Sequence, residues 1–584
     1  MKKTKYVIGD ILFILIAGFM ASIPLLNKGV DGAVYQDLQF HLSRIESIKE
    51  GLLAGEFPLM MQSVWMEGKG YPVSIFYGDA LLYVAAIFRM VGIPVVTSYK
   101  IFVWLANFAT AASALICFKH IFGKNGSLCD IKDQDSIALK KDIRVLAPSY
   151  ISAFLYVTAS YRLMDIFVRA AVGEYLSFIF FPIIALAMFN ILSEDVSGKN
   201  YFKNSLLLTL GMTGLVETHL LSTVMTTFLL ALVCILYAKR TFRKRTLLCI
   251  LAAIGETIAV NLYFFVPFLD YYIHEPVYAG KGGDHSQAMQ IRESGAYISQ
   301  LFDFFGHIFG INIDDPDYRM QLTIGLALMF ALLVSFILFV AMFRKYKIFV
   351  VGAMSVLTIW MSTNMFPWNS LEGYTHLFKL LSNVQFPWRY MAAAVTFVSV
   401  LVGMIISGLV EKKRSIGLAF SGLLAVAAVA TTLSFSSEYK NNYYMVNFAE
   451  YSEVDSGYMG ACEYLKPGTT LDITQYIPEN EQLDRYEIVR EKGNKIVVYV
   501  TNSSSSSYVE IPKINYKGYK AFDDKGKKMD ISNGYLNLIN VSVPAGYDGE
   551  ITVKFKQPVL WRISEIVSLL SVVLLAVLCK KNNQ

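Results

Sequence analysis

Residues 322–343 read LTIGLALMFALLVSFILFVAMF and contain no charged side chain. Residues 391–410 form a second uncharged apolar run. A helix needs about 20 predominantly apolar residues to cross a bilayer, so each run predicts a transmembrane helix. Such runs recur along the whole chain, and a single N-terminal secretion signal therefore does not explain them. The sequence predicts an all-α polytopic membrane protein.

The composition supports a membrane protein. Hydrophobic residues make up 55% of the 584 residues and charged residues 17%, against about 25% charged in an ordinary soluble domain. The 52 Lys and Arg exceed the 46 Asp and Glu by 6, an excess too small to indicate a nucleic-acid partner. The six cysteines show no CxxC spacing, so neither a zinc site nor a disulfide framework is expected.

Basic residues set the predicted topology. Lysines precede the first span and place the N-terminus in the cytoplasm. If residues 74–91 lie along the outer interface instead of crossing, the basic segment 119–144 also falls inside. About 12 spans follow, at roughly 6–26, 99–118, 145–160, 174–192, 204–217, 221–237, 246–269, 321–343, 348–363, 389–410, 415–434 and 558–579. The protein is expected to be a multi-pass protein of the cytoplasmic membrane.

The chain divides into three predicted parts. Residues 1–434 form the transmembrane domain, and its outer loops are 27–99, 161–173, 270–320 and 364–388. Residues 435–557 form an extracytoplasmic segment, which contains alternating apolar residues and turn signals such as Asn533-Gly534. This pattern predicts a small β-sandwich at about 484–557. Residues 558–584 form a final transmembrane helix and a cytoplasmic tail.

The first outer loop carries a polar stripe. If the chain is helical from Asp37, then Asp37, His41 and Arg44 follow one another at i, i+4 and i+7 on one face. One interpretation is an amphipathic interfacial helix with solvated charges. The other is a carboxylate and an imidazole held at the membrane surface, where a base or a metal ligand could meet a lipid-linked substrate.

Three further polar groups are predicted at the same outer face. Arg169 and Glu174 lie in or beside the short loop 161–173, Glu217 and His219 interrupt an apolar stretch, and Arg389 stands where the chain re-enters the membrane. Each has a structural alternative, such as a helical ion pair, a self-satisfied polar pair or an interfacial anchor. The convergence of all of them on one side indicates a functional site.

Three stretches resemble the GT-C superfamily of integral membrane glycosyltransferases. They are Asp37 with His41, the segment from Gly70-Tyr-Pro to Phe76-Tyr77, and Arg169-Ala-Ala-Val-Gly-Glu174. In oligosaccharyltransferase catalytic subunits, similar stretches carry the first-loop acidic residue and the second-loop acidic pair that bind metal. Only Glu174 matches the second position here. The resemblance implies a GT-C-like transmembrane domain.

The chain also resembles the bacterial YfhO-type membrane proteins and their uncharacterised relatives. The residues concerned are Phe386-Pro-Trp-Arg389 and the Tyr516–Phe522 stretch in the predicted β-domain. The resemblance covers most of the chain. It implies a glycosyltransferase that moves a sugar from a polyprenyl-phosphate-linked donor to a polymer or lipid acceptor of the cell envelope. The active site and the β-domain would both lie outside the cytoplasm.

The resemblance assigns catalytic and metal-binding roles. Asp37 would deprotonate the acceptor hydroxyl or bind a divalent cation such as Mg or Mn. His41 would position Asp37 or bind the donor phosphate. Glu174 would bind the same metal or hold an arginine. No other cofactor is implied.

It also assigns substrate-binding roles. Arg169 and Arg389 would neutralise the lipid phosphate that leaves as the glycosidic bond breaks. Arg44 would contact the substrate, and Glu217 and His219 would line the donor or acceptor pocket. The β-domain would bind an acceptor polymer or cover the site.

Two other functions remain open at this point. A transporter or flippase of a lipid-linked sugar would use the same outer cavity, and would need ionisable residues near the middle of the membrane. A non-catalytic membrane scaffold that presents the β-domain would tolerate the loss of Asp37. The expected partners are the sugar donor, the envelope acceptor and the lipid bilayer, with no nucleic acid.

Overall fold

The structure is a computed structural model. It describes residues 2–26, 37–124, 143–198, 200–278, 295–305, 309–310, 319–342, 345–371, 384–442, 462–503 and 505–581. Most of the basic segment 119–144, parts of the outer loops 27–99, 270–320 and 364–388, and residues 443–461 and 504 of the segment 435–557 lie outside these residues.

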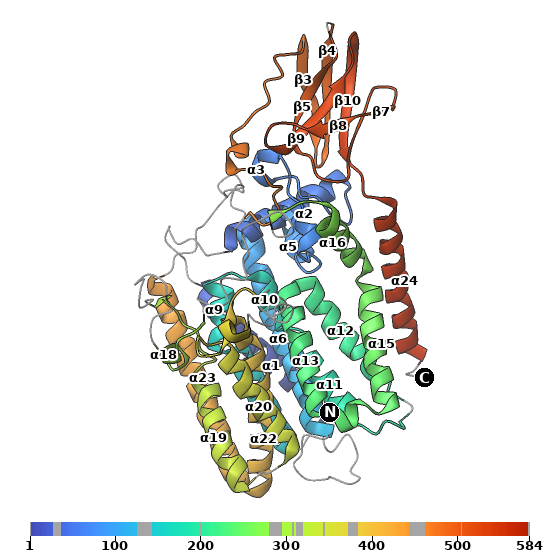
Figure 1. The fold of residues 1–584 in the computed structure, drawn as a ribbon. Helices are drawn as coiled ribbons and strands as arrows, with labels where there is room; N and C mark the ends of the chain where they lie inside the picture. The colour runs from blue at the N-terminus through green and yellow to red at the C-terminus, as the bar shows by residue number, and fades with distance from the viewer. Residues whose placement is uncertain are drawn as a thin grey trace.

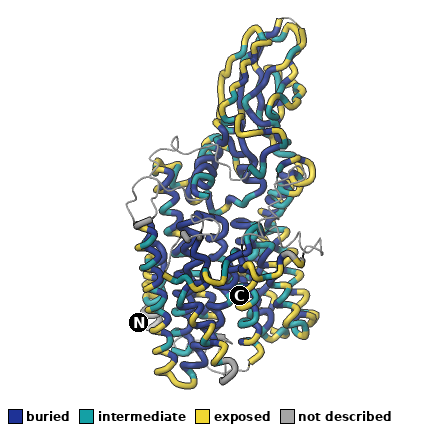
Figure 2. The backbone as a smooth tube through the Cα atoms, turned by 60° about the vertical axis from the view of Figure 1, so that its left-hand side comes forward, coloured by how far each residue is buried: buried dark blue, intermediate teal, exposed yellow. Residues whose placement is uncertain are grey.

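Helices build the lower body of the molecule (Figure 1). The longer helices are α1 (Lys2–Ser22), α6 (Val95–Lys124), α8 (Ile143–Val157), α11 (Phe181–Ser193), α12 (Lys203–Thr218), α13 (Leu220–Leu236), α15 (Lys244–Val260), α16 (Leu262–His274), α19 (Leu326–Met342), α20 (Tyr346–Met361), α22 (Tyr390–Lys412), α23 (Arg414–Asn442) and α24 (Val559–Lys581). Their outer surfaces are exposed and their inner surfaces buried (Figure 2). This is the distribution expected where lipid covers the outside.

The structure does not confirm the 12 predicted spans. Within the described residues, 6 helices are long and apolar enough to cross a membrane, or 7 if α15 and α16, bent by 73°, count as one span. Three shorter apolar helices add to these, at Leu220–Leu236, Leu326–Leu338 and Tyr346–Met361. The chain does break near His219 as predicted, because His219 is extended between α12 and α13.

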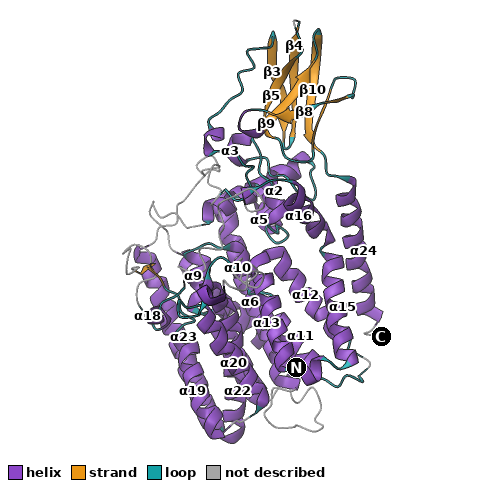
Figure 3. Ribbon diagram, viewed as in Figure 1, coloured by secondary structure: helices purple, strands orange, loops and turns teal. Residues whose placement is uncertain are grey.

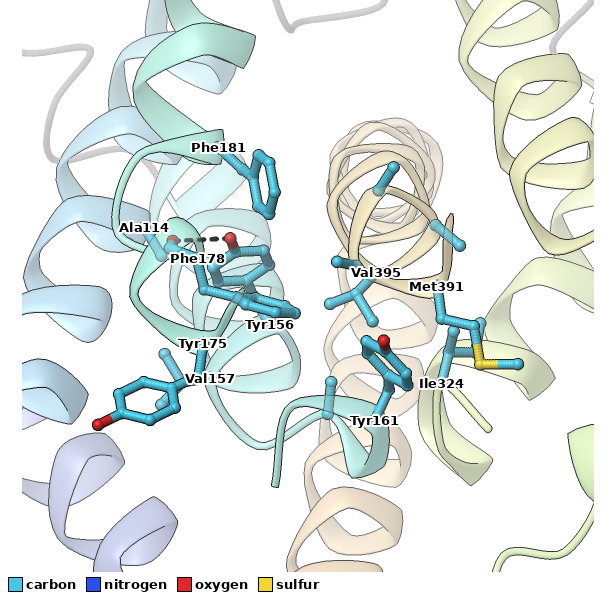
Figure 4. Packing of buried hydrophobic residues seen from close by; sticks show 14 of the residues in the cluster. Ala114, Tyr156, Val157, Tyr161, Tyr175, Phe178, Phe181, Ile324, Met391 and Val395 are labelled. Carbon is cyan, nitrogen blue, oxygen red and sulfur yellow. Dashed lines mark hydrogen bonds between the residues drawn. The ribbon is translucent and has the colours of Figure 1, made fainter. Parts of the chain in front are cut away.

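Helix α22 is the centre of the helical body. It packs against α8, α19, α20 and α23, and nearly all of its side chains from Tyr390 to Val410 are buried. Figure 4 shows Met391 and Val395 of α22 facing Tyr161, with Tyr156 and Phe178 close by. The Tyr156 hydroxyl donates to the Phe178 carbonyl at 2.7 Å, which satisfies a polar group in an apolar interior.

Short helices join the longer ones, some of them directly beneath the β-domain (Figure 1). They are α2 (Leu38–Ala54), α3 (Trp65–Gly68), α4 (Val73–Phe76), α5 (Tyr83–Met90), α9 (Ser160–Phe167), α10 (Val172–Ser177) and α18 (Ile298–Leu301). The segment 74–91, predicted to lie along the interface, forms α4, a turn and α5. The helices α3, α4, α5, α9 and α18 are too short to cross a bilayer, whereas α10 continues into α11 as the candidate span Val172–Ser193.

Two antiparallel sheets form the β-domain (Figure 3). One has the order β3-β4-β10-β6-β7 and the other β5-β9-β8. The strands are β3 (Arg485–Lys492), β4 (Lys495–Asn502), β5 (Ser507–Ile514), β6 (Tyr519–Phe522), β7 (Lys528–Met529), β8 (Ile531–Asn533), β9 (Leu538–Val543) and β10 (Tyr547–Phe555). A short hairpin elsewhere pairs β1 (Phe309–Gly310) with β2 (Arg319–Met320). The strands of the β-domain fall within the predicted range 484–557.

The β-domain shares a core with the first outer loop. Trp65, Tyr71 and Phe76 of that loop belong to the same buried cluster as the interior of the two sheets. Phe76 stacks on Tyr464 with 4.6 Å between the ring centroids. The Asn494 side chain donates to Glu56 at 2.7 Å. The β-domain therefore packs against the first outer loop, whose described part begins at Asp37.

Candidate functional site

Glu174 is the centre of a buried charged cluster. Its Oε1 accepts a hydrogen bond from the Tyr161 hydroxyl at 2.5 Å. Its Oε2 accepts from Arg169 Nη1 at 2.8 Å and from Arg389 Nε at 3.1 Å. Only 1% of the side chain is exposed. Both carboxylate oxygens are thus occupied, and Glu174 fixes two arginines from elements that are distant in the sequence.

Asp165 joins this cluster from α9. Its Oδ1 accepts from Arg169 Nη1 at 2.8 Å, whereas its Oδ2 is buried without a hydrogen-bond partner among the described residues. Burial raises the pKa of the Asp165 carboxyl well above its ordinary value, and the neighbouring Glu174 raises it further. An unpartnered buried oxygen costs free energy. Such a group in a charged cluster is characteristic of functional sites.

Asp37 lies at the start of α2. Its backbone N–H donates to the Arg169 carbonyl at 3.0 Å, which joins the first outer loop to the second. Its carboxylate accepts no hydrogen bond from any residue that the structure describes. The loss of surrounding water raises the pKa of Asp37, and the charges of Arg169 and Arg389 oppose that rise. Asp37 is therefore a carboxylate beside two cations, with its oxygens available.

His41 stands one turn further along α2. Its Nδ1 lies 3.2 Å from Arg44 Nη1. A guanidinium can only donate, so Nδ1 accepts this bond and Nε2 carries the proton of the neutral ring. Burial lowers the pKa of His41 well below its ordinary value, and the charge of Arg44 lowers it further. His41 consequently presents an N–H donor.

Arg44 is held away from the Glu174 side chain. It donates to Asp79 through Nε at 3.1 Å and through Nη2, and to the Gly78 carbonyl at 2.8 Å. Its guanidinium lies 4.1 Å from the centre of the Tyr77 ring. The side chain is 1% exposed. Arg44 therefore orients His41 and Tyr77, and does not reach the cluster around Glu174.

The predicted pair Glu217 and His219 separates in the structure. His219 interacts electrostatically with Arg389, Glu174 and Arg169, and its Nδ1 lies 2.8 Å from the Ser222 hydroxyl. Glu217 instead accepts from the Tyr263 hydroxyl at 2.5 Å, on another side of α12. The helix ends at Thr218 and His219 is extended, so the two side chains point to different surroundings.

Arg389 is fixed by the turn before α22. Its Nη1 donates to the Val384 carbonyl at 2.8 Å and to Gln385 Oε1 at 2.6 Å. The Phe386 ring lies 5.1 Å from its guanidinium and 6.0 Å from that of Arg169. Arg389 Nη2, and Nε and Nη2 of Arg169, make no hydrogen bond with a described residue. Two oriented arginines thus keep donors for an anion.

We call Asp37, Asp165, Arg169, Glu174 and Arg389 the Glu174 cluster. It combines residues from α2, α9, α10 and the start of α22, and it carries three carboxyl groups and two guanidinium groups. His41 and His219 lie beside it, whereas Arg44 and Glu217 do not belong to it. Sequence reasoning did not assign a role to Asp165 or Tyr161. The spacing of Asp165 and Arg169 at i and i+4 was the available signal.

The cluster does not fit a divalent cation. Both oxygens of Glu174 are already bonded, and the two arginines place positive charge where a cation would have to bind. Among the described residues, no group of three His, Cys, Asp or Glu side chains is placed to hold a metal ion. Metal binding by Asp37 and Glu174 stays a prediction that this geometry does not favour.

An apolar cavity lies beneath the cluster. It is lined by α11, α13, α20 and α22. On α22 it begins at Ala393, one turn below Arg389, and continues to Met404, a length of about 16 Å at 1.5 Å per residue. Its far end is lined by Tyr237 and Lys347. Apart from that end the lining is almost wholly hydrocarbon, which suits a lipid chain.

Comparisons with known proteins provide little beyond this geometry. No protein-family model matches the chain. A stretch of 94 residues is 34% identical to an uncharacterised protein of Lactococcus lactis subsp. cremoris (strain MG1363) and covers 15% of each chain.

Solved structures of an Archaeoglobus fulgidus oligosaccharyltransferase are also similar. The apo form gives a TM-score of 0.41 at 12% identity, over 74% of this chain and 56% of that chain. The complex with an inhibitory peptide and a dolichol-phosphate gives a TM-score of 0.37 at 12% identity. This chain spans about half the length of the archaeal enzyme. TM-scores below 0.5 assign neither a shared fold nor a shared activity.

Proposed function

We propose that this protein is a membrane glycosyltransferase that uses a polyprenyl-phosphate-linked sugar and acts on an acceptor of the cell envelope outside the cytoplasm. The observation that carries the proposal is the Asp37 carboxylate, which accepts no hydrogen bond from the described residues and lies beside the unbonded donors of Arg169 and Arg389. A base next to an anion-binding pair is what sugar transfer from a phosphate requires.

The donor would bind at two places. Its phosphate would accept hydrogen bonds from Arg169 Nε and Nη2 and from Arg389 Nη2, and its isoprenoid tail would enter the cavity that begins at Ala393. Guanidinium groups bind phosphate oxygens with directed, charge-assisted hydrogen bonds. The tail would contribute binding energy in proportion to the apolar area that it buries.

The chemical step follows from this placement. Asp37 takes the proton of the acceptor hydroxyl, and the acceptor oxygen bonds to the anomeric carbon of the donor sugar. The bond from that carbon to the phosphate oxygen breaks, and its electron pair remains on the phosphate. Arg169 and Arg389 stabilise the negative charge as it develops. The Nε2–H of His41 would donate to an oxygen of the bound donor.

In this proposal the arginines neutralise the phosphate, so no step is assigned to a cation. Glu174 and Tyr161 hold the two guanidinium groups in place. Groups fixed in this way do not have to reorganise when charge develops, which is why preorganised charges lower barriers.

A transporter of a lipid-linked sugar is the second candidate. The observation that favours it is the length of the cavity, which runs from Ala393 to Lys347 at the far helix ends. A transporter has to carry the polar headgroup across the membrane. Between those ends the lining is apolar, which suits the tail better than the headgroup.

Reconstitution of the full chain into proteoliposomes tests both candidates. Transfer of labelled sugar from synthetic polyprenyl-phosphate sugars to envelope acceptors would be measured for wild type, Asp37→Asn and Glu50→Gln. Glu50 is a matched control because it lies on the same helix with 42% of its side chain exposed. Transfer that Asp37→Asn abolishes and Glu50→Gln preserves supports the enzyme. Movement of labelled donor between leaflets without transfer supports the transporter. Neither transfer nor movement by the wild-type protein would leave the scaffold.

A further inference from the structure

Four lysines face one another across the five-stranded sheet of the β-domain. The register pairs Lys492 of β3 with Lys495 of β4, Lys495 with Lys554 of β10, and Lys554 with Lys520 of β6. Directly paired residues of antiparallel strands project from the same face. We call these four residues the lysine row. It crosses four strands at one level and measures about 14 Å, three strand spacings of about 4.8 Å.

The lysine row lies on the outer face of the sheet. Its sequence neighbours Ile496, Val553 and Ala521 are buried between the two sheets. Because successive side chains of a strand alternate between faces, the lysines point outward. Lys492, Lys495 and Lys520 are exposed, and Lys554 is partly exposed.

The lysine row lacks compensating charge. None of the four forms an ion pair or a hydrogen bond through its side chain with another described residue. Like charges placed directly opposite each other destabilise a sheet. The distal part of the same face is arranged differently, since Arg485 pairs with Glu487 at 2.7 Å and Asp548 accepts from the Tyr499 hydroxyl at 2.8 Å. The lysine row thus differs from this distal part, because its four charges have no ion pair with a described residue.

Protection of sheet edges does not explain the lysine row. Exposed lysines on edge strands prevent pairing with other chains. However, β4 and β10 are inner strands, paired on both sides. Lys556 and Lys528 flank the row. Lys556 lies 5.8 Å from the Phe522 ring, on which Lys554 of the row also packs at 5.1 Å, and Lys528 pairs with Phe522 across the strands.

The row lies at the end of the sheet that docks on the membrane domain. The turn between Lys492 and Lys495 contains Asn494, which bonds to Glu56 of the first outer loop. Helix α2 leads back from Ala54 to Leu38, a distance of about 24 Å at 1.5 Å per residue. The sheet is separated from the start of α24 at Val559 by the segment 556–558. The loop contact of the row at Glu56 is thus separated from Asp37 of the Glu174 cluster by the length of α2.

We propose that the lysine row binds a linear polyanion, a polymer that carries phosphate groups at regular intervals. Ammonium groups on flexible stems are suited to a series of phosphate charges along a chain. A polymer satisfies charges arranged in a line, and its binding would offset the repulsion within the row. Binding by the row does not depend on the proposed function. Its role as an acceptor subsite does rest on that function.

Binding of poly(glycerol phosphate) to the detergent-solubilised full chain tests the proposal. The row variant carries Lys492→Gln, Lys495→Gln, Lys520→Gln and Lys554→Gln. The control variant carries Lys239→Gln, Lys244→Gln, Lys413→Gln and Lys580→Gln, which remove the same charge at the other end of the molecule. The row variant should bind at least tenfold more weakly, and the control should bind like wild type. With four contacts, log K should fall against log salt with a slope of about −3, and the row variant should lose that slope.

Several outcomes would overturn the proposal. Equal weakening in both variants would show a net-charge effect, and unchanged binding in the row variant would show that the row is not the site. Loss of binding to phosphatidylglycerol vesicles, with polymer binding intact, would assign the row to a lipid surface. A double variant, Lys495→Gln with Lys554→Gln, is the control for misfolding. Its thermal midpoint should be at least that of wild type, because the substitutions remove repulsion between the paired lysines. Asp37→Asn should retain polymer binding, which separates this test from the test of sugar transfer.

Discussion

Two buried charged regions lie close together at the same end of the helices, and they differ in how completely their hydrogen bonds are satisfied. Around Arg44, Asp79 accepts from Arg44, from Ser74 and from Gln62 Nε2 at 3.3 Å, and Gln62 in turn accepts from Trp65 at 2.8 Å. We call these five residues the Arg44 network. In the Glu174 cluster, by contrast, the Asp37 carboxylate and Asp165 Oδ2 accept no hydrogen bond from the described residues.

This difference indicates a structural role for the charges of the Arg44 network and a functional role for those of the Glu174 cluster. A buried network in which each partner is satisfied holds elements together, and breaking one pair leaves an uncompensated charge. A cluster with unsatisfied acceptors and free guanidinium donors has the capacity to bind something more. We therefore expect substitutions in the Arg44 network to affect stability first and substitutions in the Glu174 cluster to affect activity first.

The largest expected effect is on stability, in the Arg44 network. Asp79→Ala would leave Arg44 buried with its charge unpaired, which should lower the free energy of unfolding by about 3–5 kcal/mol. Denaturant unfolding in detergent measures this. Asp195→Ala is the control, because Asp195 is exposed, and it should change stability little. A normal midpoint for Asp79→Ala would show that the two regions do not differ as described.

Asp37→Asn should have the next largest effect, and on turnover alone. The substitution keeps the shape of the side chain, and no described residue donates a hydrogen bond to the lost charge, so unfolding should be unchanged. Sugar transfer should fall about a hundredfold, the lower end of what a general base contributes. Near-normal transfer by a well-inserted Asp37→Asn protein would remove Asp37 from the chemistry.

The pH dependence of the wild-type protein also tests Asp37 as the general base. A general base acts when deprotonated, so turnover should decline as pH falls through the pKa of Asp37. Burial raises that pKa, and the decline should therefore begin above the range of a free carboxyl, about 3.9. Asp37→Asn should lose this limb of the profile, measured as initial rates at saturating donor.

Arg389→Ala and Arg389→Lys should differ from each other. Alanine removes the positive charge that we propose lies beside the donor phosphate, and we expect donor use to weaken about thirtyfold, roughly 2 kcal/mol. Lysine keeps the charge and loses the directed donors, so the loss should be smaller, about fivefold. KM for the donor and kcat in both variants measure the effect. Equal and near-normal kinetics in the two would show that Arg389 is only an interfacial anchor.

Sequence reasoning identified the elements of the site better than their arrangement. Runs of uncharged residues predicted helices such as α22, and the alternation near residue 495 predicted strands. The stripe of Asp37 and His41 also lies where a helix begins. These features depend on short-range periodicity, which the sequence displays directly.

The arrangement depended on contacts between distant residues. Arg44 was predicted to meet the substrate, but its partner Asp79 lies 35 positions away, and no local pattern indicates that pairing. Hydropathy alone also could not determine the number of membrane spans. Apolar runs as short as α20 do not reveal whether a helix crosses fully or stops within the protein.

The smallest expected effect concerns the pair that the sequence joined and the structure separates. Glu217 bonds to Tyr263 away from the Glu174 cluster, whereas His219 interacts with Arg389, Glu174 and Arg169. Glu217→Gln keeps an oxygen that can accept from Tyr263, so transfer should stay within about twofold of wild type. His219→Ala removes a neighbour of the two arginines proposed to bind the donor and should lower transfer about tenfold, near 1.4 kcal/mol. Sugar-transfer rates of the two variants, measured side by side, test this. Equal losses in both would place Glu217 in the site and contradict the separation of the two side chains.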